Sequence, residues 1–167
     1  WYNQNLNNAT YTQYLDDTAV YCNNRSVSDL GSWNKSSTNN ATYLQFKQYS
    51  ANRDLNCENA TDRFSVSNTK AELTYPIGLL TEPERNLMAN TYATTGQSYW
   101  ELSPRSFGLD AASVRPVNAP GAVSSTYANY ANGARPTLTL APSVEIEEGS
   151  GTYTDPYVVG PKVTRTY

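Results

Sequence analysis

Hydrophobic and polar residues follow different patterns in the two halves of the chain. In the first half, apolar side chains recur at helical spacing only over short stretches. Tyr2 and Leu6 share one helical face, and Tyr11 shares another with Leu15. This spacing predicts one or two short helices within residues 1–17.

The clearest helical signal is the segment TEPERNLMANTY, which begins at Thr81. Thr81 is a good N-cap residue, a proline suits the first turn, and Glu84 completes a capping box. We expect Leu87 and Met88 to face the core and the helix to end near Asn90.

In the second half, the pattern changes to the alternation that is typical of strands. Trp100 and Leu102 alternate with Tyr99 and Glu101 in the segment SYWELSPRSF. A half with helices followed by a half rich in strands indicates an α+β fold.

Two turn signals divide this second half. The segment NAPGAV matches a type II turn with Pro120 and Gly121 at its centre. The segment SVEIEEGSGTYTDPYVV predicts two short strands around a Gly-Ser-Gly turn. Glu145 and Glu147 share one face of the first of these strands, and we expect that face to be exposed to solvent.

Composition restricts the class of protein. The 167 residues suit a single domain, 38% of them are hydrophobic and only 16% are charged, and 14 are tyrosines. The net charge is −3 and no basic cluster occurs, which argues against nucleic acid as a partner. No apolar run approaches the roughly 20 residues that span a bilayer. Because the chain begins at Trp1, we expect it to be the C-terminal part of a longer, processed surface protein.

Two cysteines are the whole thiol content of the chain, and histidine is absent. We expect Cys22 and Cys57 to form a disulfide, which by chain-entropy arguments is worth about 4 kcal/mol. The alternative is a pair of free buried thiols in a cytoplasmic protein. Neither the cysteines nor any acidic loop has the spacing of a metal site, so we expect no cofactor, and a calcium ion has no motif to support it.

The carboxylates offer little for catalysis. Glu82 and Glu84 serve the start of a helix, and the acidic residues around Glu145 suit a solvent-facing strand. Without histidine, the commonest general base is also missing. We therefore expect a protein that is not an enzyme.

Five Asn-x-Ser/Thr sequons occur, and about four are expected by chance in a chain so rich in Asn, Ser and Thr. Both interpretations, glycan acceptors and coincidence, stay open. The asparagines of these sequons are Asn8, Asn24, Asn34, Asn40 and Asn59.

Three motifs in the second half carry a resemblance to a known family. YWELSP, GARPTLTL and VEIEEGSGTYTDPYVV resemble signatures of bacterial C-type-lectin-like domains, as found in Firmicutes surface and pilin-like proteins. These domains are similar to the formylglycine-generating enzyme fold and to the variable proteins of diversity-generating retroelements. The likeness extends over nearly the whole chain. It implies two short helices packed on a small twisted antiparallel sheet, with a ligand-facing surface in the C-terminal half.

The resemblance also implies roles for individual residues. Trp100 would be structural and lie in the core with Leu102, whereas Tyr99 and Glu101 would face outward. Arg135 and Pro136 would also be structural. Whether residues 99–132 form a diversified region stays open, as does whether the tyrosines in SSTYANYANG form a binding surface or pack locally. The residues expected to contact a ligand are Tyr99, Glu101, Arg105, Phe107, Asn118, Tyr127, Asn129, Tyr130 and Asn132.

The chain departs from the family at functional positions. No cysteine follows Cys57, although the formylglycine-generating enzymes need late cysteines, and the Glu-Pro-Asn motif of calcium-dependent lectins is missing. Three hypotheses follow. The chain is an extracellular recognition domain, of adhesin or receptor-binding type, for a cell-surface protein or glycan; or it is a subunit or globular head of a pilin-like filament that contacts copies of itself; or it is a degenerate, non-catalytic relative of the formylglycine-generating enzymes.

Overall fold

The computed structural model describes residues 1–26, 44–45, 55–88, 96–107, 112–119, 121–122, 124–152 and 154–161. These residues form short helices and curled, mostly antiparallel sheets, in agreement with the predicted α+β class. The elements in chain order are α1 (Tyr2–Asn5), α2 (Ala9–Thr12), β1 (Tyr21–Cys22), β2 (Leu44–Gln45), the 3₁₀ helix η2 (Ala60–Asp62), β3 (Arg63–Phe64), β4 (Gly78–Leu79), α3 (Glu82–Leu87), β5 (Tyr99–Phe107), β6 (Ala112–Val117), β7 (Thr126–Tyr127), β8 (Gly133–Ala134), β9 (Pro136–Thr137), β10 (Val144–Glu148) and β11 (Val158–Pro161).

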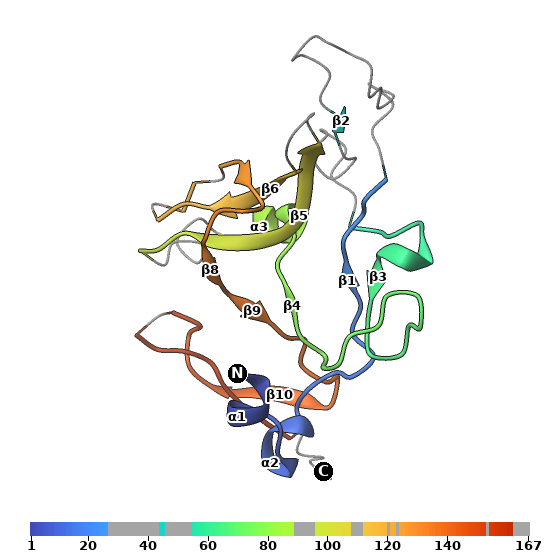
Figure 1. Ribbon diagram of the computed structural model, residues 1–167. Coiled ribbons are helices and arrows are strands. Elements are labelled where there is room, and N and C mark those ends of the chain that lie inside the picture. The colour runs from blue at the N-terminus through green and yellow to red at the C-terminus, as the bar shows by residue number, and fades with distance from the viewer. Residues whose placement is uncertain are drawn as a thin grey trace, which may run out of the picture.

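The largest sheet has the strand order β2-β5-β6-β7, and β8 adds a parallel pairing to the start of β5. Its centre is the antiparallel pair β5–β6, which runs from Tyr99 opposite Val117 to Phe107 opposite Ala112. The helix α3 lies against β5 (Figure 1). This sheet and α3 together form the part of the molecule that carries most of the predicted site residues.

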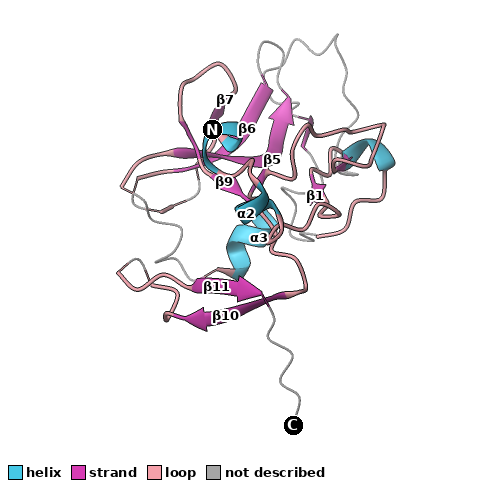
Figure 2. Ribbon diagram, turned by 90° about the horizontal axis from the view of Figure 1, so that it is seen from below, coloured by secondary structure: helices cyan, strands magenta, loops and turns pink. Residues whose placement is uncertain are grey.

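Three two-stranded ribbons make up the rest of the described sheet structure: β1–β3, β4–β9 and β10–β11. The β10–β11 ribbon lies along one edge of the molecule in Figure 2. The first residues of the chain are tied to the second half by backbone hydrogen bonds, from Asp16 N to Thr139 O and from Ala141 N to Tyr14 O. None of the helices in the described part of the chain is long and apolar enough to cross a membrane.

The predicted α3 forms, but it buries different side chains than expected. Thr81 and Glu84 make both hydrogen bonds of the capping box, which confirms the predicted start of the helix. The expectation that Leu87 faces the core is wrong, because its side chain is 75% exposed. The helix instead buries Glu82 and Arg85. It places charged groups, not apolar ones, against the sheet.

The alternation along β5 is present, but with the opposite phase to the prediction. Tyr99 and Glu101 are 4% and 3% exposed, whereas Trp100 and Leu102 are only partly buried. The assignment of Trp100 to the core and of Tyr99 and Glu101 to the outward face is therefore wrong. A period of two fixes which residues share a face, but not which face meets the core. Here the charged and polar partners supplied by α3 decide the phase.

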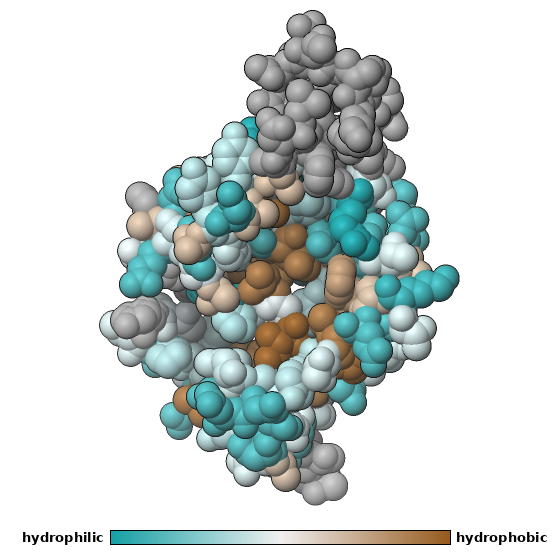
Figure 3. Space-filling model, in the orientation of Figure 1, coloured by the Kyte–Doolittle hydropathy of each residue, from teal (hydrophilic) through white to brown (hydrophobic). Residues whose placement is uncertain are grey.

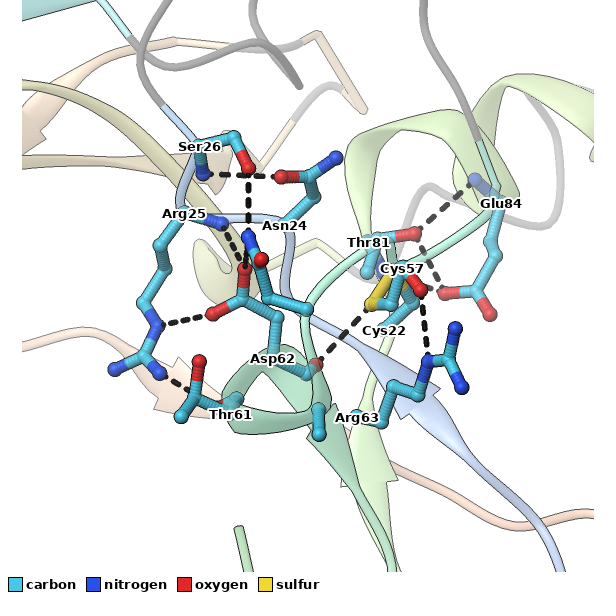
Figure 4. Close-up of a disulfide and its surroundings, with 12 residues drawn as sticks. Cys22, Asn24, Arg25, Ser26, Cys57, Thr61, Asp62, Arg63, Thr81 and Glu84 are labelled. Atoms are coloured by element: carbon cyan, nitrogen blue, oxygen red, sulfur yellow. Dashed lines mark hydrogen bonds and ion pairs between the residues drawn. A yellow bond between two sulfur atoms is a disulfide. The ribbon is translucent and has the colours of Figure 1, made fainter. Parts of the chain in front are cut away.

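The predicted disulfide between Cys22 and Cys57 is present, with Cα atoms 5.5 Å apart. It joins β1 to the segment before η2, and Figure 4 shows the polar contacts around it. The side chain of Arg63 donates to Cys57 O at 2.7 Å. Backbone also approaches closely here, since a Cβ atom at Gly78 would lie 2.3 Å from the ring of Tyr21. Only glycine fits at that contact.

The two turn predictions fare differently. Gly121 has φ of 85°, but its N–H donates to Asn118 O, so it is the fourth residue of the turn that this bond closes and not the third, and Pro120 lies outside the described residues. Gly149 and Gly151 have φ of 89° and 75° between β10 and β11, as expected for the Gly-Ser-Gly turn. The pair Glu145 and Glu147 is exposed, as predicted.

The sequons differ in accessibility. Asn34 and Asn40 lie outside the described residues. Asn8 and Asn59 are exposed, and Asn8 caps α2 through its side-chain oxygen. Asn24 is 2% exposed, and its Oδ1 accepts a hydrogen bond from Ser26 N. The interpretation of Asn24 as a glycan acceptor is therefore incompatible with its burial in the folded protein.

Candidate ligand-binding pocket

A pocket of about 470 Å³ opens on the largest sheet, where β5, β6 and β7 lie side by side. Its lining is polar and aromatic, with one guanidinium and no carboxylate among the described residues. The side chains that line it are Arg105, Ser106, Ser113, Ser125, Thr126, Tyr127 and Tyr130. We refer to it as the Arg105 pocket.

A bulge in β5 positions Arg105. Pro104 lies opposite Val114 and Ser106 lies opposite Ser113, so two steps along β5 match one step along β6 and Arg105 is the additional residue. Pro104 has no N–H to donate to the ladder, and prolines within sheets are found at such irregularities. By alternation, Arg105 falls on the same face as Tyr99 and Glu101. The bulge brings Ser106 to that face beside Arg105, opposite Ser113.

Strand pairing places three of the lining residues in one row. Ser106 on β5 is the partner of Ser113 on β6, which in turn is the partner of Tyr127 on β7. Directly opposed residues of neighbouring antiparallel strands point to the same face, with Cβ atoms about 5 Å apart. Ser106 is only 5% exposed and forms the floor of this row. The sheet therefore holds two hydroxyls and a phenol ring at fixed spacing.

Two tyrosines form the rim of the pocket. Tyr127 ends β7, and a turn with a hydrogen bond from Tyr130 N to Tyr127 O brings the second ring beside the first. The ring centroids are 6.1 Å apart and the planes are inclined by 17°. The residues nevertheless stay 50% and 60% exposed. The two alternatives left open by the sequence therefore both hold in part, because the rings pack locally and also present their faces to solvent.

The structure brings together three of the nine predicted ligand contacts, namely Arg105, Tyr127 and Tyr130. The exposed Asn129 and the partly buried Asn132 belong to the loop that carries Tyr130, although neither lines the pocket.

The other predicted contacts lie elsewhere. Tyr99 and Glu101 are buried, and the side chain of Phe107 is outside the described part of the structure. Asn118 follows the end of β6 that pairs with the start of β5, and its backbone closes a turn with Gly121. Tyr99 and Glu101 thus belong to the interior rather than to a binding surface.

Sequence reasoning missed four lining residues, which are all small and hydroxylated. Ser106 and Ser113 are not adjacent in the sequence, and only the register of β5 against β6 makes them neighbours. Ser125 and Thr126 precede Tyr127 on the edge strand. One sequence signal could have found these four residues. It is the alternation of side chains, typical of strands, on either side of the segments that contain proline.

A buried ionic network lies beneath this sheet and fixes α3 to it. Arg85 of α3 donates to Glu101 of β5 at 2.5 Å. Glu82 of α3 accepts two hydrogen bonds from Arg115 of β6, at 2.8 and 3.0 Å. Ser103 Oγ also accepts from Glu82 N at 2.8 Å. Because each charge has a partner of opposite sign, the helix is able to bury its polar face.

Among the titratable groups of the described residues, the carboxyl of Glu101 is the one most altered by its surroundings. Burial raises the pKa of its carboxyl to about 7, although the neighbouring Arg85 acts in the opposite direction. Its Oε2 atom accepts no hydrogen bond from the described residues. Perturbed pKa values often mark reaction centres. At 3% exposure, however, this carboxyl does not meet a solute in the folded protein, and we assign it to the interior network.

Arg135 has a structural environment, as the resemblance implied. Its guanidinium lies over the ring of Tyr99, 5.4 Å from the centroid, and its NH1 atom is 3.5 Å from the Tyr99 hydroxyl. The next residue, Pro136, begins β9 and pairs with Leu79 of β4. This contact explains the burial of Tyr99, which packs beneath an arginine from the neighbouring segment.

A second hollow of about 330 Å³ lies near the disulfide, and we refer to it as the Arg25 hollow. It is lined by Arg25, Ser26, Asn59, Thr61 and Asp62. Arg25 donates from Nε to Asp62 Oδ1 at 2.8 Å and from NH2 to Thr61 O at 2.6 Å (Figure 4). The hollow thus contains its own carboxylate, and its polar groups bind one another.

Comparisons with family models, with curated proteins and with solved structures found no match to this chain. Among the described residues, no group of three His, Cys, Asp or Glu side chains is placed to hold a metal ion.

Proposed function

We propose that this chain is an extracellular ligand-recognition domain with a C-type-lectin-like fold, and that the Arg105 pocket is its binding site. The observation that carries the proposal is the pair Tyr127 and Tyr130, two rings that stack on each other yet stay half exposed at the rim of a polar pocket. Tyrosine offers a large rigid contact area at low entropic cost. The domain binds its ligand without breaking bonds.

The disulfide supports the extracellular part of this proposal. Such cross-links form and persist in oxidising compartments and are rare in the cytosol. The bond between Cys22 and Cys57 joins segments 35 residues apart. This bond stabilises the first half of the chain, whereas the residues that line the pocket belong to the second half.

The test is a panel of glycans and cell-surface proteins probed with the isolated domain. A variant with both Tyr127→Ala and Tyr130→Ala is compared with Tyr157→Ala, which removes a tyrosine that is 54% exposed elsewhere. We expect the double variant to lose binding and the control to keep it. If both variants bind every hit as the parent does, the site proposed here is wrong.

One observation favours a second function, that of a subunit in a surface filament. The β10–β11 ribbon exposes apolar side chains, with Ile146 at 59%, Tyr157 at 54% and Val158 at 47%. Contacts between copies of the chain would cover them. Size-exclusion chromatography and electron microscopy distinguish the two functions, because filaments favour the second and a monomer that binds glycans or cells favours the first.

A further inference from the structure

We propose that the Arg105 pocket takes an uncharged pyranose sugar, bound without a calcium ion, an inference that rests on the proposed function. Two features of the lining suit such a ligand. The first is a row of hydroxyls held at the spacing of the strands, and the second is a pair of exposed phenol rings at the rim.

The row of hydroxyls crosses three strands. Ser106 of β5 lies opposite Ser113 of β6, which in turn lies opposite Tyr127 of β7. Neighbouring strands are about 4.8 Å apart, so successive side chains of the row begin at about that separation. Equatorial hydroxyls on alternate carbons of a pyranose ring have a similar separation. A rigid sugar ring is therefore able to meet two neighbouring positions of the row at once.

The chemistry of these side chains also matches a ligand that is rich in hydroxyls. A serine hydroxyl both donates and accepts hydrogen bonds, as a sugar hydroxyl does. Ser106 and Ser113 are short side chains on paired strands, so little conformational entropy is lost when they bind. Ser125, two residues before Tyr127, also lines the pocket and extends this polar surface along the edge of the sheet.

The rim supplies the apolar surface that a sugar ring also needs. The face of an aromatic ring is electronegative, so it attracts the C–H groups on one side of a pyranose. Tyr127 and Tyr130 present nearly parallel rings with centroids 6.1 Å apart, and they stay 50% and 60% exposed. An open-chain sugar alcohol has similar hydroxyls but no rigid C–H face. The rim therefore favours the closed ring.

The charge of the lining favours neither an ionic ligand nor a bridging metal ion. Arg105 makes a further interaction within the chain, so the choice of ligand does not depend on its charge. The other described residues of the lining are uncharged, and an ion that leaves water without a partner loses much of its hydration energy. Calcium takes several oxygen ligands, commonly carboxylates, and the described lining contains no carboxylate.

The experiment compares probes that differ in one feature of the sugar. The methyl pyranosides of glucose, galactose and mannose, and the open-chain alcohols sorbitol, galactitol and mannitol, are titrated into the intact chain and followed by NMR. We expect at least one pyranoside to bind roughly tenfold more tightly than its open-chain alcohol, with the same affinity in EDTA. The methyl glycoside of the matching uronic acid should bind no more tightly than the neutral sugar.

Two variants test the two features of the lining separately. Ser113→Ala removes the middle hydroxyl of the row and is expected to weaken binding about threefold to tenfold. Tyr130→Ala removes one ring of the rim and should weaken binding by roughly tenfold. The matched control is Ser143→Ala, which removes an exposed serine outside the pocket and should leave the affinity unchanged.

The comparisons between probes decide the outcome even if a variant does not fold. The uncharged-pyranose inference is overturned if no pyranoside binds, if pyranoside and open-chain alcohol bind equally, if EDTA abolishes binding, or if the uronic acid binds more tightly. Unchanged affinity in both Ser113→Ala and Tyr130→Ala would also overturn it. Peptide or protein binders that are lost in the double variant of Tyr127 and Tyr130 would remove the sugar but leave the proposed function standing. The absence of any ligand for the folded chain would remove both.

Discussion

The Arg25 hollow and the Arg105 pocket differ in what surrounds the guanidinium. In the Arg25 hollow, the cation meets the carboxylate of Asp62, a residue that is 3% exposed. In the Arg105 pocket, the described lining consists of hydroxyls and phenol rings. A cation that is paired with a built-in acid holds two segments of chain together. The Arg105 cation lies among short hydroxyls and beside two exposed rings, and this is the surface to which the proposed function assigns a ligand.

The same contrast occurs along one face of the largest sheet, because Ser113 and Arg115 are two residues apart on β6 and point to the same side. On the part of this face that α3 covers, Glu82 and Arg115 form a two-bond pair, and Arg85 meets Glu101. Hydrophobic residues gather in the middle of the face shown in Figure 3, surrounded by polar ones. Inside this molecule, charged pairs therefore hold elements together. The predictions below test which charged residues have this structural role and which bind a ligand.

The largest effect is expected when the interior pair is broken. Glu82→Ala removes the carboxylate that Arg115 binds and leaves a guanidinium in a buried place. We expect the free energy of unfolding to fall by about 3–5 kcal/mol. Urea denaturation measures it, with Glu148→Ala on the exposed face of β10 as control, expected to stay within about 0.5 kcal/mol. Similar losses for the two variants would show that the interior network contributes nothing special.

The second prediction concerns the disulfide. Replacing Cys22 and Cys57 by serine is expected to lower the free energy of unfolding by about 2–4 kcal/mol, because the unfolded chain gains freedom. At a temperature where the variant remains folded, binding at the Arg105 pocket should be unchanged. The pocket is built from β5, β6 and β7, and no described lining residue adjoins the disulfide. A loss of ligand affinity in the folded variant would contradict this separation.

The third prediction follows from the raised pKa of Glu101, about 7 in the folded protein. The unfolded carboxyl titrates near 4.5, so between these two values the folded state binds a proton that the unfolded state does not. Stability is therefore greatest below pH 4.5 for this group and is lost as pH rises through 7, by up to about 3 kcal/mol.

Thermal or urea unfolding between pH 4.5 and 8, compared with Glu101→Gln, isolates this contribution. The amide cannot ionise, so the difference between the two proteins should change across this window. A difference that stays flat would show that Glu101 remains ionised beside Arg85 throughout.

Local chemistry explains which parts of the fold were predictable. The capping box at Thr81 and the glycine turn at Gly149 depend on neighbours in sequence, and both form as expected. The phase of β5 depends on Glu82 and Arg85, which lie far away in sequence and are themselves buried. The resemblance placed Tyr99 and Glu101 outward, and a pattern of hydrophobicity, which assigns charged residues to the surface, could not correct that assignment.

The candidate site shows the same division. Tyr127 and Tyr130 were found from composition, because a short polar segment with two tyrosines is typical of binding loops. Ser106 and Ser113 were not, since their proximity exists only in the register of β5 against β6. Pro104 and its neighbour Arg105 lie between these cases. A proline in a strand predicts an irregularity, but the direction in which the bulge turns the next side chain is a property of the folded sheet.

The smallest effect on stability is expected at Arg25 and Arg105, the two arginines compared above. The two variants should differ in whether they change stability or ligand affinity. Arg25→Gln removes one partner of the buried Asp62 carboxylate, which still accepts a bond from Arg25 N. Because the Arg25 side chain is 48% exposed, we expect a loss of only about 1 kcal/mol and no change in ligand affinity. Arg105→Gln should instead lower the affinity for the ligand tenfold or more, because it removes the guanidinium from the lining of the pocket. Urea denaturation and calorimetric titration on the same samples give both quantities for each variant. If both variants change stability and ligand affinity to the same extent, the distinction between a structural Arg25 and a ligand-binding Arg105 is wrong.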